Sequence, residues 1–295
     1  MLSTSRRLLA STASRCLSTS ASGAITVNED LPNVYHVKLN RPTKLNTFTL
    51  DMWKELKVVI DGLGEEPKCR SIIVSGEGKS FCAGIDLAAG MSNIINIFKN
   101  DDLDIGRKAR SLRRILTIIQ DSLTSLEKCP KPVIAAVHSH CLGAGIDLIT
   151  SADIRYASQD VTFSIKEVDI GLAADIGTLN RIQKVVGNDS WTREVCFTAR
   201  DFGADEALKY GLVSRIFDSQ EHLLEKSLEV AALIAAKSPI AVQGTKETLN
   251  YARDHSTHDS LNFVKTWNMS QLLSTDLVNS ATAALKKEKA TYANV

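Results

Sequence analysis

Residues 132–156 read PVIAAVHSHCLGAGIDLITSADIRY, and this stretch decides the class of fold. Its apolar run at 132–137 predicts a short buried strand. The small residues at 141–145 predict a tight turn that leads into a helix over 144–150, and residues 153–156 predict another short strand. A strand, a glycine turn, a helix and a second strand in this order are typical of an α/β core.

The same alternation continues on both sides of this stretch. Before it, the pattern predicts one strand over 24–40, a second over 71–75, and helices over 50–62 and 107–126. After it, the pattern predicts a strand over 161–164 and helices over 177–186 and 189–198. From about residue 218 the strand signals end, and helices are expected over 221–237, 240–253 and 258–274. We therefore expect an α/β core over residues 23–217 and a helical region over residues 218–295.

The first 22 residues, MLSTSRRLLASTASRCLSTSAS, contain Arg6, Arg7 and Arg15 but no Asp or Glu. A segment rich in Arg and Ser that lacks acids is typical of a mitochondrial transit peptide, and its LLA run is too short for a secretory signal. The last three residues, ANV, do not form the Ser-Lys-Leu peroxisomal address. We therefore expect residues 1–22 to be a transit peptide and the mature protein to reside in the mitochondrial matrix.

The composition argues against several classes of protein. The chain of 295 residues has 44% hydrophobic and 23% charged residues, which is ordinary for a globular protein. A formal net charge of +1 gives no reason to expect a nucleic-acid partner, and no apolar run is long enough to cross a bilayer. The six cysteines form no C-x-x-C pair and no zinc spacing, so we expect free thiols and no metal site.

Two short loops are rich in small residues: Ala83-Gly84-Ile85 and Gly143-Ala144-Gly145. Small residues let a ligand approach the backbone closely, and two free amides that converge on one oxygen form an oxyanion hole. The second loop also leads into a predicted helix, whose N-terminus favours negative charge. Each loop taken alone could be a plain tight turn. A dinucleotide-binding fingerprint is not indicated, because no third glycine follows at the expected place.

Three carboxylates lie in otherwise apolar sequence close to glycine turns: Asp147, Glu167 and Asp175. Asp147 comes three residues after Ala144, so the two lie close to the same face of the predicted helix. Burial and mutual repulsion raise carboxyl pKa values toward neutrality, where such groups can exchange protons. Each acid alone could be a helix cap or the partner of a distant cation. Three together beside glycine turns favour acid–base chemistry.

Four stretches of the chain resemble the successive signatures of the enoyl-CoA hydratase/isomerase (crotonase) superfamily: SGEGKSFCAGIDL, KPVIAAVHSHCLGAGIDLITSADIRYAS, KEVDIGLAADIGTLNRIQKVVGN and ADEALKYGLVSRIF. The resemblance runs from about residue 25 to the C-terminus. It implies an α/β fold, a crotonase-like spiral of β-β-α units with a helical C-terminal trimerisation region. It also implies a fatty acyl-CoA substrate, a homotrimer or hexamer, and no cofactor, because coenzyme A is part of the substrate.

The same resemblance assigns roles to the two loops. The backbone amides of Ile85 and Ala144 would hold the thioester oxygen of the substrate. Many members of the family have glycine at the second of these positions. Ala144 keeps the backbone amide, but its methyl group limits how closely the substrate can approach that amide. The residues expected to contact substrate are Ala83, Gly84, Ile85, Asp86, Leu87 and Ala144.

The acids distinguish branches within the family. Hydratases have Glu at the positions of Asp147 and Glu167, whereas the set with Asp175 added resembles that of the Δ3,5-Δ2,4-dienoyl-CoA isomerases. Their reaction removes a proton from carbon 2 and delivers one to carbon 6, so it needs two acid–base groups. We predict Glu167 as the base at carbon 2, Asp175 as the acid at carbon 6 and Asp147 as a catalytic charge that acts on both. An enoyl-CoA hydratase, a Δ3-Δ2-enoyl-CoA isomerase and a non-catalytic binding protein with this fold are the alternatives.

Overall fold

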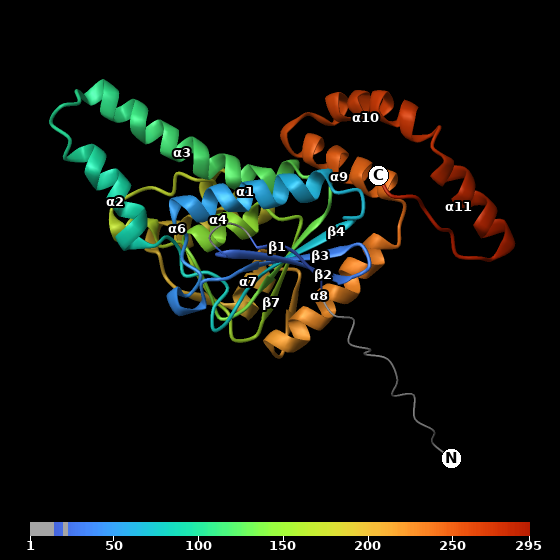
Figure 1. Ribbon diagram of the computed structural model, residues 1–295, viewed down its shortest axis with the longest axis horizontal. Coiled ribbons are helices and arrows are strands. Elements are labelled where there is room, and N and C mark those ends of the chain that lie inside the picture. Colours follow the sequence, from blue (N-terminus) through green and yellow to red (C-terminus); the bar gives the residue numbers. More distant parts are fainter. Residues whose placement is uncertain (1–14, 20–22) are drawn as a thin grey trace, which may run out of the picture.

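A sheet of mostly parallel strands forms the centre of the molecule (Figure 1). The computed structural model describes residues 15–19 and 23–295. Within the described residues the strands follow one another across the sheet in this order: β1 (Arg15–Thr19), β2 (Ile25–Leu31), β3 (Val34–Leu39), β4 (Ser71–Gly76), β5 (Val133–Val137), β7 (Ile154–Ser158) and β10 (Arg215–Phe217). The pairs from β3 to β10 are parallel, and β1, β2 and β3 pair antiparallel. The predicted α/β class is confirmed.

The predicted single strand over 24–40 is wrong, because the chain turns back within it. Strands β2 and β3 form an antiparallel hairpin, and Asn33 at the turn has a φ of 66°. Asn adopts this left-handed conformation more readily than most residues. The alternation of apolar and polar residues continues on both sides of Asn33, so periodicity alone does not reveal the turn.

The predicted transit segment, residues 1–22, falls mainly on positions 1–14 and 20–22, which lie outside the described residues. Between them, β1 pairs with β2 at the edge of the sheet. Strand β1 lies at the edge of the described sheet, and β2 pairs with β3 on its other side.

Alternate residues of the central strands pack into two cores on opposite faces of the sheet. On β4, Ile72 and Val74 belong to the larger core and Ile73 to the smaller one, as the two-residue period of a strand requires. Helices α1 (Leu50–Glu65) and α3 (Ile105–Lys128) cover the larger core. Helix α8 (Gln220–Ala235) covers the smaller core on the other face (Figure 1). Burial of both faces explains why the parallel strands are almost continuously apolar.

A second sheet, of three strands in the described residues, carries the second glycine loop. Strand β6 (His140–Leu142) pairs in parallel with β8 (Thr162–Ser164), and β8 pairs antiparallel with β9 (Phe202–Gly203). Helix α4 (Ala144–Thr150) begins just after β6, and the short 3-10 helix η2 (Glu167–Ile170) begins just after β8. Further helices follow: α5 (Thr178–Val185), α6 (Asp189–Thr198) and α7 (Ala204–Tyr210). The loop at 143–145 and Glu167 therefore start from the ends of two paired parallel strands.

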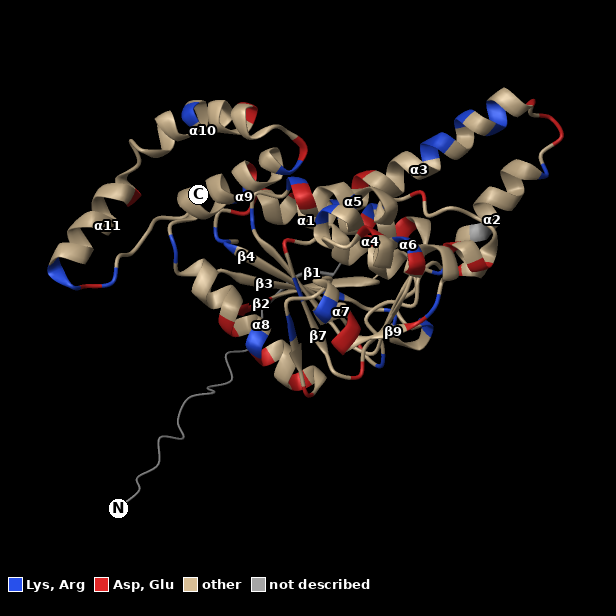
Figure 2. Cartoon of the chain, turned by 180° about the vertical axis from the view of Figure 1, so that it is seen from behind, with Lys and Arg blue, Asp and Glu red and all other residues tan. Residues whose placement is uncertain are grey.

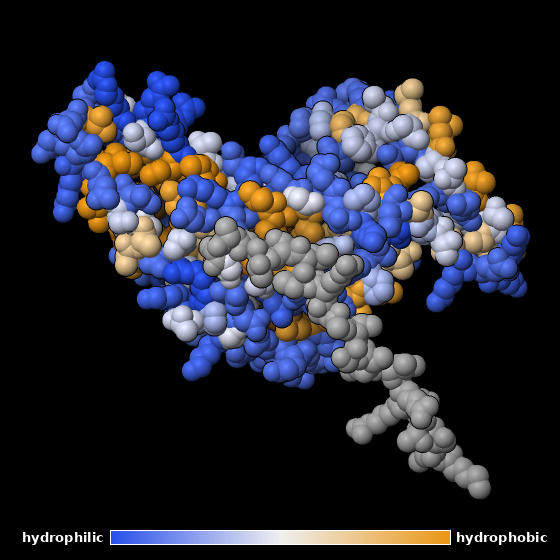
Figure 3. Space-filling view, viewed as in Figure 1, coloured by the Kyte–Doolittle hydropathy of each residue, from blue (hydrophilic) through white to orange (hydrophobic). Residues whose placement is uncertain are grey.

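Two helical arms extend from this body (Figure 1). The first is α2 (Leu87–Phe98) with the N-terminal half of α3, on whose ribbon Figure 2 marks several Lys and Arg positions in blue. The second is formed by α9 (Pro239–Asp254), α10 (Thr257–Gln271) and α11 (Thr275–Lys286). The sequence pattern predicted neither α2 nor α11. Both arms carry exposed apolar side chains (Figure 3), and none of the described helices has the length and apolar character needed to span a membrane.

Candidate active site

A cavity of about 220 Å³ lies between the two glycine loops and the first helical arm. Two of the predicted carboxylates, Glu167 and Asp175, line it together with both loops. The rest of the lining is mostly apolar and comes from α2 (Leu87, Ile94), α3 (Ile115, Leu116, Ile119) and the segment around η2 (Ile170, Leu172, Ile176). An apolar cavity with a few convergent polar groups is the usual form of a small-molecule site.

The first loop is held by backbone hydrogen bonds on both sides of Ile85. The Phe48 amide donates to the Gly84 carbonyl over 2.9 Å, and the Asp86 amide donates to the Phe48 carbonyl over 2.8 Å. Gly84 has a φ of 99°, which glycine adopts without the strain that a side chain would cause. The Ile85 amide donates to no other described residue. It is therefore available to a ligand.

The second loop is fixed where the Gly143 amide donates to the Ser164 carbonyl, 2.9 Å away at the end of β8. Ala144 is the first residue of α4, so its amide has no acceptor within the helix. A side chain at Gly145 would meet the Cys82 backbone carbonyl oxygen at 3.1 Å, so glycine lets the two loops pack together here. This geometry supports the predicted pair of amides, Ile85 and Ala144, as an oxyanion hole.

Asp147 is fully buried in α4 and does not itself line the cavity. Its Oδ1 accepts a 2.5 Å hydrogen bond from the Thr178 amide at the start of α5, and its Oδ2 has no hydrogen-bond partner among the described residues. Burial raises the pKa of Asp147 to about 7; the hydrogen bonds from Thr178 oppose this rise, the Glu167 charge adds to it and the Arg181 charge opposes it. This carboxyl therefore titrates near neutral pH.

Glu167 and Asp175 differ in their exposure. Glu167 is half-buried, and its pKa is raised mainly by burial and further by the Asp175 charge. Asp175 is exposed, and partial desolvation raises its pKa as well. A side chain at Gly143 would lie 3.1 Å from Glu167 Oε1, so this carboxylate is directly beside the second loop. Gln120 of α3 donates to the Asp175 backbone carbonyl over 2.7 Å and thereby holds that segment.

The structure gives Asp86 a supporting position at the first loop. Its Oδ1 accepts from the Ala89 amide over 3.1 Å as the N-cap of α2, and its Oδ2 pairs with Arg41 at 2.9 Å. These contacts fix the start of α2 beside the loop. The other residues expected to contact substrate line the cavity: Ala83, Gly84, Ile85, Leu87 and Ala144. The contact of Asp86 with substrate stays a prediction.

Three polar residues near the site were missed by the sequence analysis: Gln120, Lys166 and Arg181. Lys166 lines the cavity, and its Nζ is held by the Ala199 carbonyl at 3.0 Å and by Asp201 at 3.0 Å. Because Lys166 directly precedes Glu167 in the sequence, its place near the site could have been predicted. Gln120 gave no such signal, because its contact joins α3 to a segment 55 residues away.

Comparison with known proteins identifies the family of the chain. A family model described as enoyl-CoA hydratase/isomerase matches residues 29–294. The mitochondrial Delta(3,5)-Delta(2,4)-dienoyl-CoA isomerase of Homo sapiens is 48% identical over 266 residues, which cover 90% of this chain and 80% of the human protein. The peroxisomal enzyme of the same name from Arabidopsis thaliana is 42% identical over 263 residues, which cover 89% of this chain and 94% of the plant protein.

Solved structures agree on the fold. The crystal structure of an enoyl-CoA hydratase from Bacillus anthracis superimposes with a TM-score of 0.82 at 27% identity, covering 92% of this chain and 99% of the bacterial one. The resemblance noted in the sequence is thus confirmed. Because the family model matches residues 29–294, which is most of the chain, the chain belongs to the enoyl-CoA hydratase/isomerase family.

Proposed function

We propose that this protein converts 3,5-dienoyl-CoA to 2,4-dienoyl-CoA in the β-oxidation of unsaturated fatty acids. The human and plant relatives are named for this reaction, which supports the proposal. The observation that carries it is that Glu167 and Asp175 line the same cavity as the free amides of Ile85 and Ala144. A shift of two conjugated double bonds needs two acid–base groups and a site for the oxyanion, and this cavity offers both.

The two amides bind the thioester oxygen of the substrate. Negative charge accumulates on this oxygen when carbon 2 loses its proton, so donors aimed at it stabilise the transition state. A single donor of this kind contributes about 3–4 kcal/mol. With the oxygen held by Ile85 and Ala144, the proton at carbon 2 becomes acidic enough for a carboxylate to remove.

Glu167 takes the proton from carbon 2, and the electrons of that bond delocalise into a dienolate. Asp175 then delivers its own proton to carbon 6, the thioester carbonyl re-forms, and the double bonds come to lie at carbons 2 and 4. Burial raises the pKa of Glu167 and partial desolvation raises that of Asp175, which brings both carboxyls closer to the range in which they exchange protons. In the reaction proposed here, Glu167 starts ionised and Asp175 starts protonated. Because Asp175 is exposed, it can exchange protons with water before the next turnover. Asp147 acts through its charge, and the three carboxyls titrate as a coupled set.

The proposal requires no cofactor, because the chemistry uses only carboxyl groups, amides and the coenzyme A of the substrate. It includes self-association as a trimer or hexamer through the helical region over 218–295. It also places the mature protein in the mitochondrial matrix. The human relative is named mitochondrial and the plant relative peroxisomal, and the acid-free segment at 1–22 favours the mitochondrial location.

Processing of the leader tests this location. The mature protein from isolated mitochondria should begin near Ser20 to Ala24. N-terminal sequencing of the organellar protein measures this, and an intact Met1 on that form would contradict it.

The reaction is tested with purified protein and 3,5-dienoyl-CoA, by following growth of the conjugated 2,4-dienoyl absorbance. Addition of water to 2-enoyl-CoA without this conversion would indicate a hydratase. Conversion of 3-enoyl-CoA to 2-enoyl-CoA alone would indicate a single-bond isomerase. Binding of acyl-CoA without any turnover would indicate a non-catalytic member of the family.

A further inference from the structure

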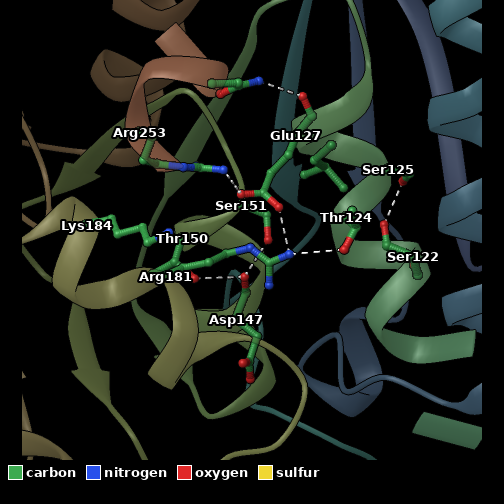
Figure 4. A network of polar contacts seen from close by, with 12 residues as sticks. Ser122, Thr124, Ser125, Glu127, Asp147, Thr150, Ser151, Arg181, Lys184 and Arg253 are labelled. Atoms are coloured by element: carbon green, nitrogen blue, oxygen red, sulfur yellow. Dashed lines mark hydrogen bonds and ion pairs between the residues drawn. The ribbon is translucent and has the colours of Figure 1, made fainter. Parts of the chain in front are cut away.

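A network of charged side chains lies beside Asp147, outside the catalytic cavity (Figure 4). Arg181 of α5 is 13% exposed, and its Nη2 donates to Glu127 Oε2 over 2.7 Å and to Thr124 Oγ1 over 3.1 Å. Arg253 of α9 approaches the other carboxylate oxygen of Glu127 at 2.9 Å. Helices α3, α5 and α9 therefore meet at one half-buried carboxylate.

Arg181 is also a neighbour of Asp147. Figure 4 shows its guanidinium between Glu127 and Asp147. A Cβ at Gly177 would collide with Arg181 Nη1 and would lie 3.9 Å from Asp147 Oδ1, so both groups lie around the space beside this glycine. The hydrogen bonds of Arg181 go to Glu127 and Thr124. The guanidinium is therefore held close to Asp147 without being paired with it.

The other groups that act on Asp147 do not supply a positive charge. Glu167, from η2, is a like charge and raises the pKa of Asp147. The Cys82 and Cys141 thiols, from the two loop strands, stay neutral because burial raises their pKa values. Thr178, from α5, contributes hydrogen bonds. Among the described groups that act on Asp147, the cation is Arg181. Two neighbouring carboxylates ionise together only at a cost in free energy, which a nearby cation reduces.

We propose that Arg181 is a positioning residue for the isomerase reaction: anchored by Glu127 and Thr124, it stabilises the ionised Asp147 beside Glu167 without forming an ion pair with it. This inference rests on the proposed function. A direct ion pair would keep Asp147 ionised at every working pH, and removal of the cation would leave it protonated at neutral pH. The anchored cation gives the intermediate case, in which Asp147 changes protonation near neutral pH.

Arg181→Met removes the charge and keeps most of the length of the side chain. The pH below which kcat/KM falls should then rise by about one unit, because the repulsion between Asp147 and Glu167 is no longer opposed. We call this pH the position of the acid limb of the profile. Arg181→Lys keeps the positive charge and should restore the wild-type position of the acid limb, although an ammonium group makes fewer hydrogen bonds to Glu127 and Thr124 than the planar guanidinium does. Glu127→Gln frees the guanidinium to approach Asp147 and should move the acid limb in the opposite direction.

Arg253→Met is the matched control. It also removes one ion pair of Glu127, but its side chain belongs to α9 and does not act on Asp147. Its acid limb should therefore stay at the wild-type pH. An unchanged acid limb in Arg181→Met, or equal shifts in Arg181→Met and Arg253→Met, would overturn the proposal.

A second measurement does not depend on isomerase activity. The free energy of unfolding is compared across pH between proteins with and without Asp147→Asn, which isolates the titration of Asp147. In the Arg181→Met background, the pH range over which Asp147→Asn changes stability should move up by about one unit. If that shift occurs but wild-type protein does not isomerise dienoyl-CoA, the proposed function fails and the link between Arg181 and Asp147 holds. If the shift is absent, the link itself fails.

Discussion

Asp147, Glu167 and Asp175 differ mainly in how far the fold removes them from water. Asp147 is fully buried, Glu167 half-buried and Asp175 exposed. Because burial disfavours the ionised form, the three side chains have unequal proton affinities although two of them are chemically identical. The two that line the cavity are those to which we assign the proton transfers.

The two ends of the proton shuttle can be separated by substitution. Asp175→Asn keeps the size and hydrogen bonding of the side chain but cannot deliver a proton, so it should abolish isomerisation while Glu167 still exchanges the proton at carbon 2. Glu167→Gln should stop both reactions. Incorporation of solvent deuterium into 3,5-dienoyl-CoA, read by mass spectrometry, measures the exchange.

A variant that no longer folds or binds substrate would lose both proton exchange and isomerisation. A variant that loses only isomerisation therefore has a defect in proton transfer, and the comparison of the two variants includes its own control. If Asp175→Asn loses the exchange and Glu167→Gln keeps it, the two roles are reversed. Isomerisation by Asp175→Asn at the wild-type rate would rule out the assignment of Asp175.

The buried Asp147 also makes stability depend on pH. Its pKa is 3.8 in an ordinary environment and about 7 in the fold, so the unfolded chain releases this proton first as the pH rises. Below pH 4 the group is neutral in both states and has no such effect. Between pH 4 and 7 the folded protein loses stability, by about 4 kcal/mol at most.

Asp147→Asn should remove this loss, because Asn still accepts the hydrogen bond from the Thr178 amide but does not ionise. We expect the variant to be more stable than wild type by about 2–4 kcal/mol at pH 8 and of nearly equal stability at pH 4. Urea unfolding at both pH values measures the difference. A difference of the same size at both pH values would show that ionisation of Asp147 is not its cause.

At the scale of elements, the turn from β6 to α4 sets the distance between the second amide and the base. Gly143 has a φ of 48° and a ψ of −113°, a combination that costs other residues about 1–3 kcal/mol. A side chain there would also press on Glu167 Oε1 at 3.1 Å. The site therefore depends on glycine at this position for both backbone shape and space.

Gly143→Ala should lower kcat at least about tenfold, because the added methyl group displaces the Glu167 carboxylate and each 1.4 kcal/mol of lost transition-state stabilisation is a factor of ten. Steady-state kinetics with 3,5-dienoyl-CoA measure this effect. The matched control is Gly187→Ala, since a side chain there would have nothing within 4 Å and should leave kcat unchanged. Equal kcat values for the two variants would contradict the argument.

Strands β2, β3 and β4 show a Ser–His–Asp arrangement that is structural. His36 bridges Asp30 at 2.6 Å and Ser75 at 2.7 Å. Ser75 is only 2% exposed and lines none of the described cavities, so no substrate can reach its hydroxyl. The arrangement satisfies buried polar groups and ties neighbouring strands together.

At the scale of the whole molecule, the C-terminal arm exposes more apolar surface than a monomer needs. Leu261, Leu272, Leu273, Val278 and Leu285 on or beside α10 and α11 are each more than half exposed. Apolar patches of this kind mark surfaces that other chains cover. They support the proposed self-association through the helical region.

The mature protein should therefore be a trimer or a dimer of trimers. Static light scattering at micromolar concentration measures its mass. Replacing Leu273 and Leu285 by Ser should shift the population toward smaller species, whereas replacing the exposed Val58 of α1 should not. A stable wild-type monomer at micromolar concentration would contradict the proposal.

Local patterns in the sequence determined most of the elements and the family. The apolar run at 132–137 predicted β5, and the helical stripe from Leu50 predicted α1. Helical spacing predicted α3, α8, α9 and α10, and the structure contains all of these elements. These patterns are readable because a strand repeats every two residues and a helix every 3.6. The three carboxylates were found in the same way, since acids in apolar sequence beside glycine turns need a reason to be there.

Tertiary structure alone decided which of these residues share a cavity. The sequence did not show the turn at Asn33. It also did not show that Asp147 lies outside the cavity lining. The hydrogen bond from Arg181 to Glu127, 54 residues earlier in the chain, was equally hidden. Periodicity reports the face on which a residue lies within its own element, but not which distant element covers that face. Contacts between α3, α4, α5 and η2 set the burial and the charge around each carboxyl, and these in turn set its pKa.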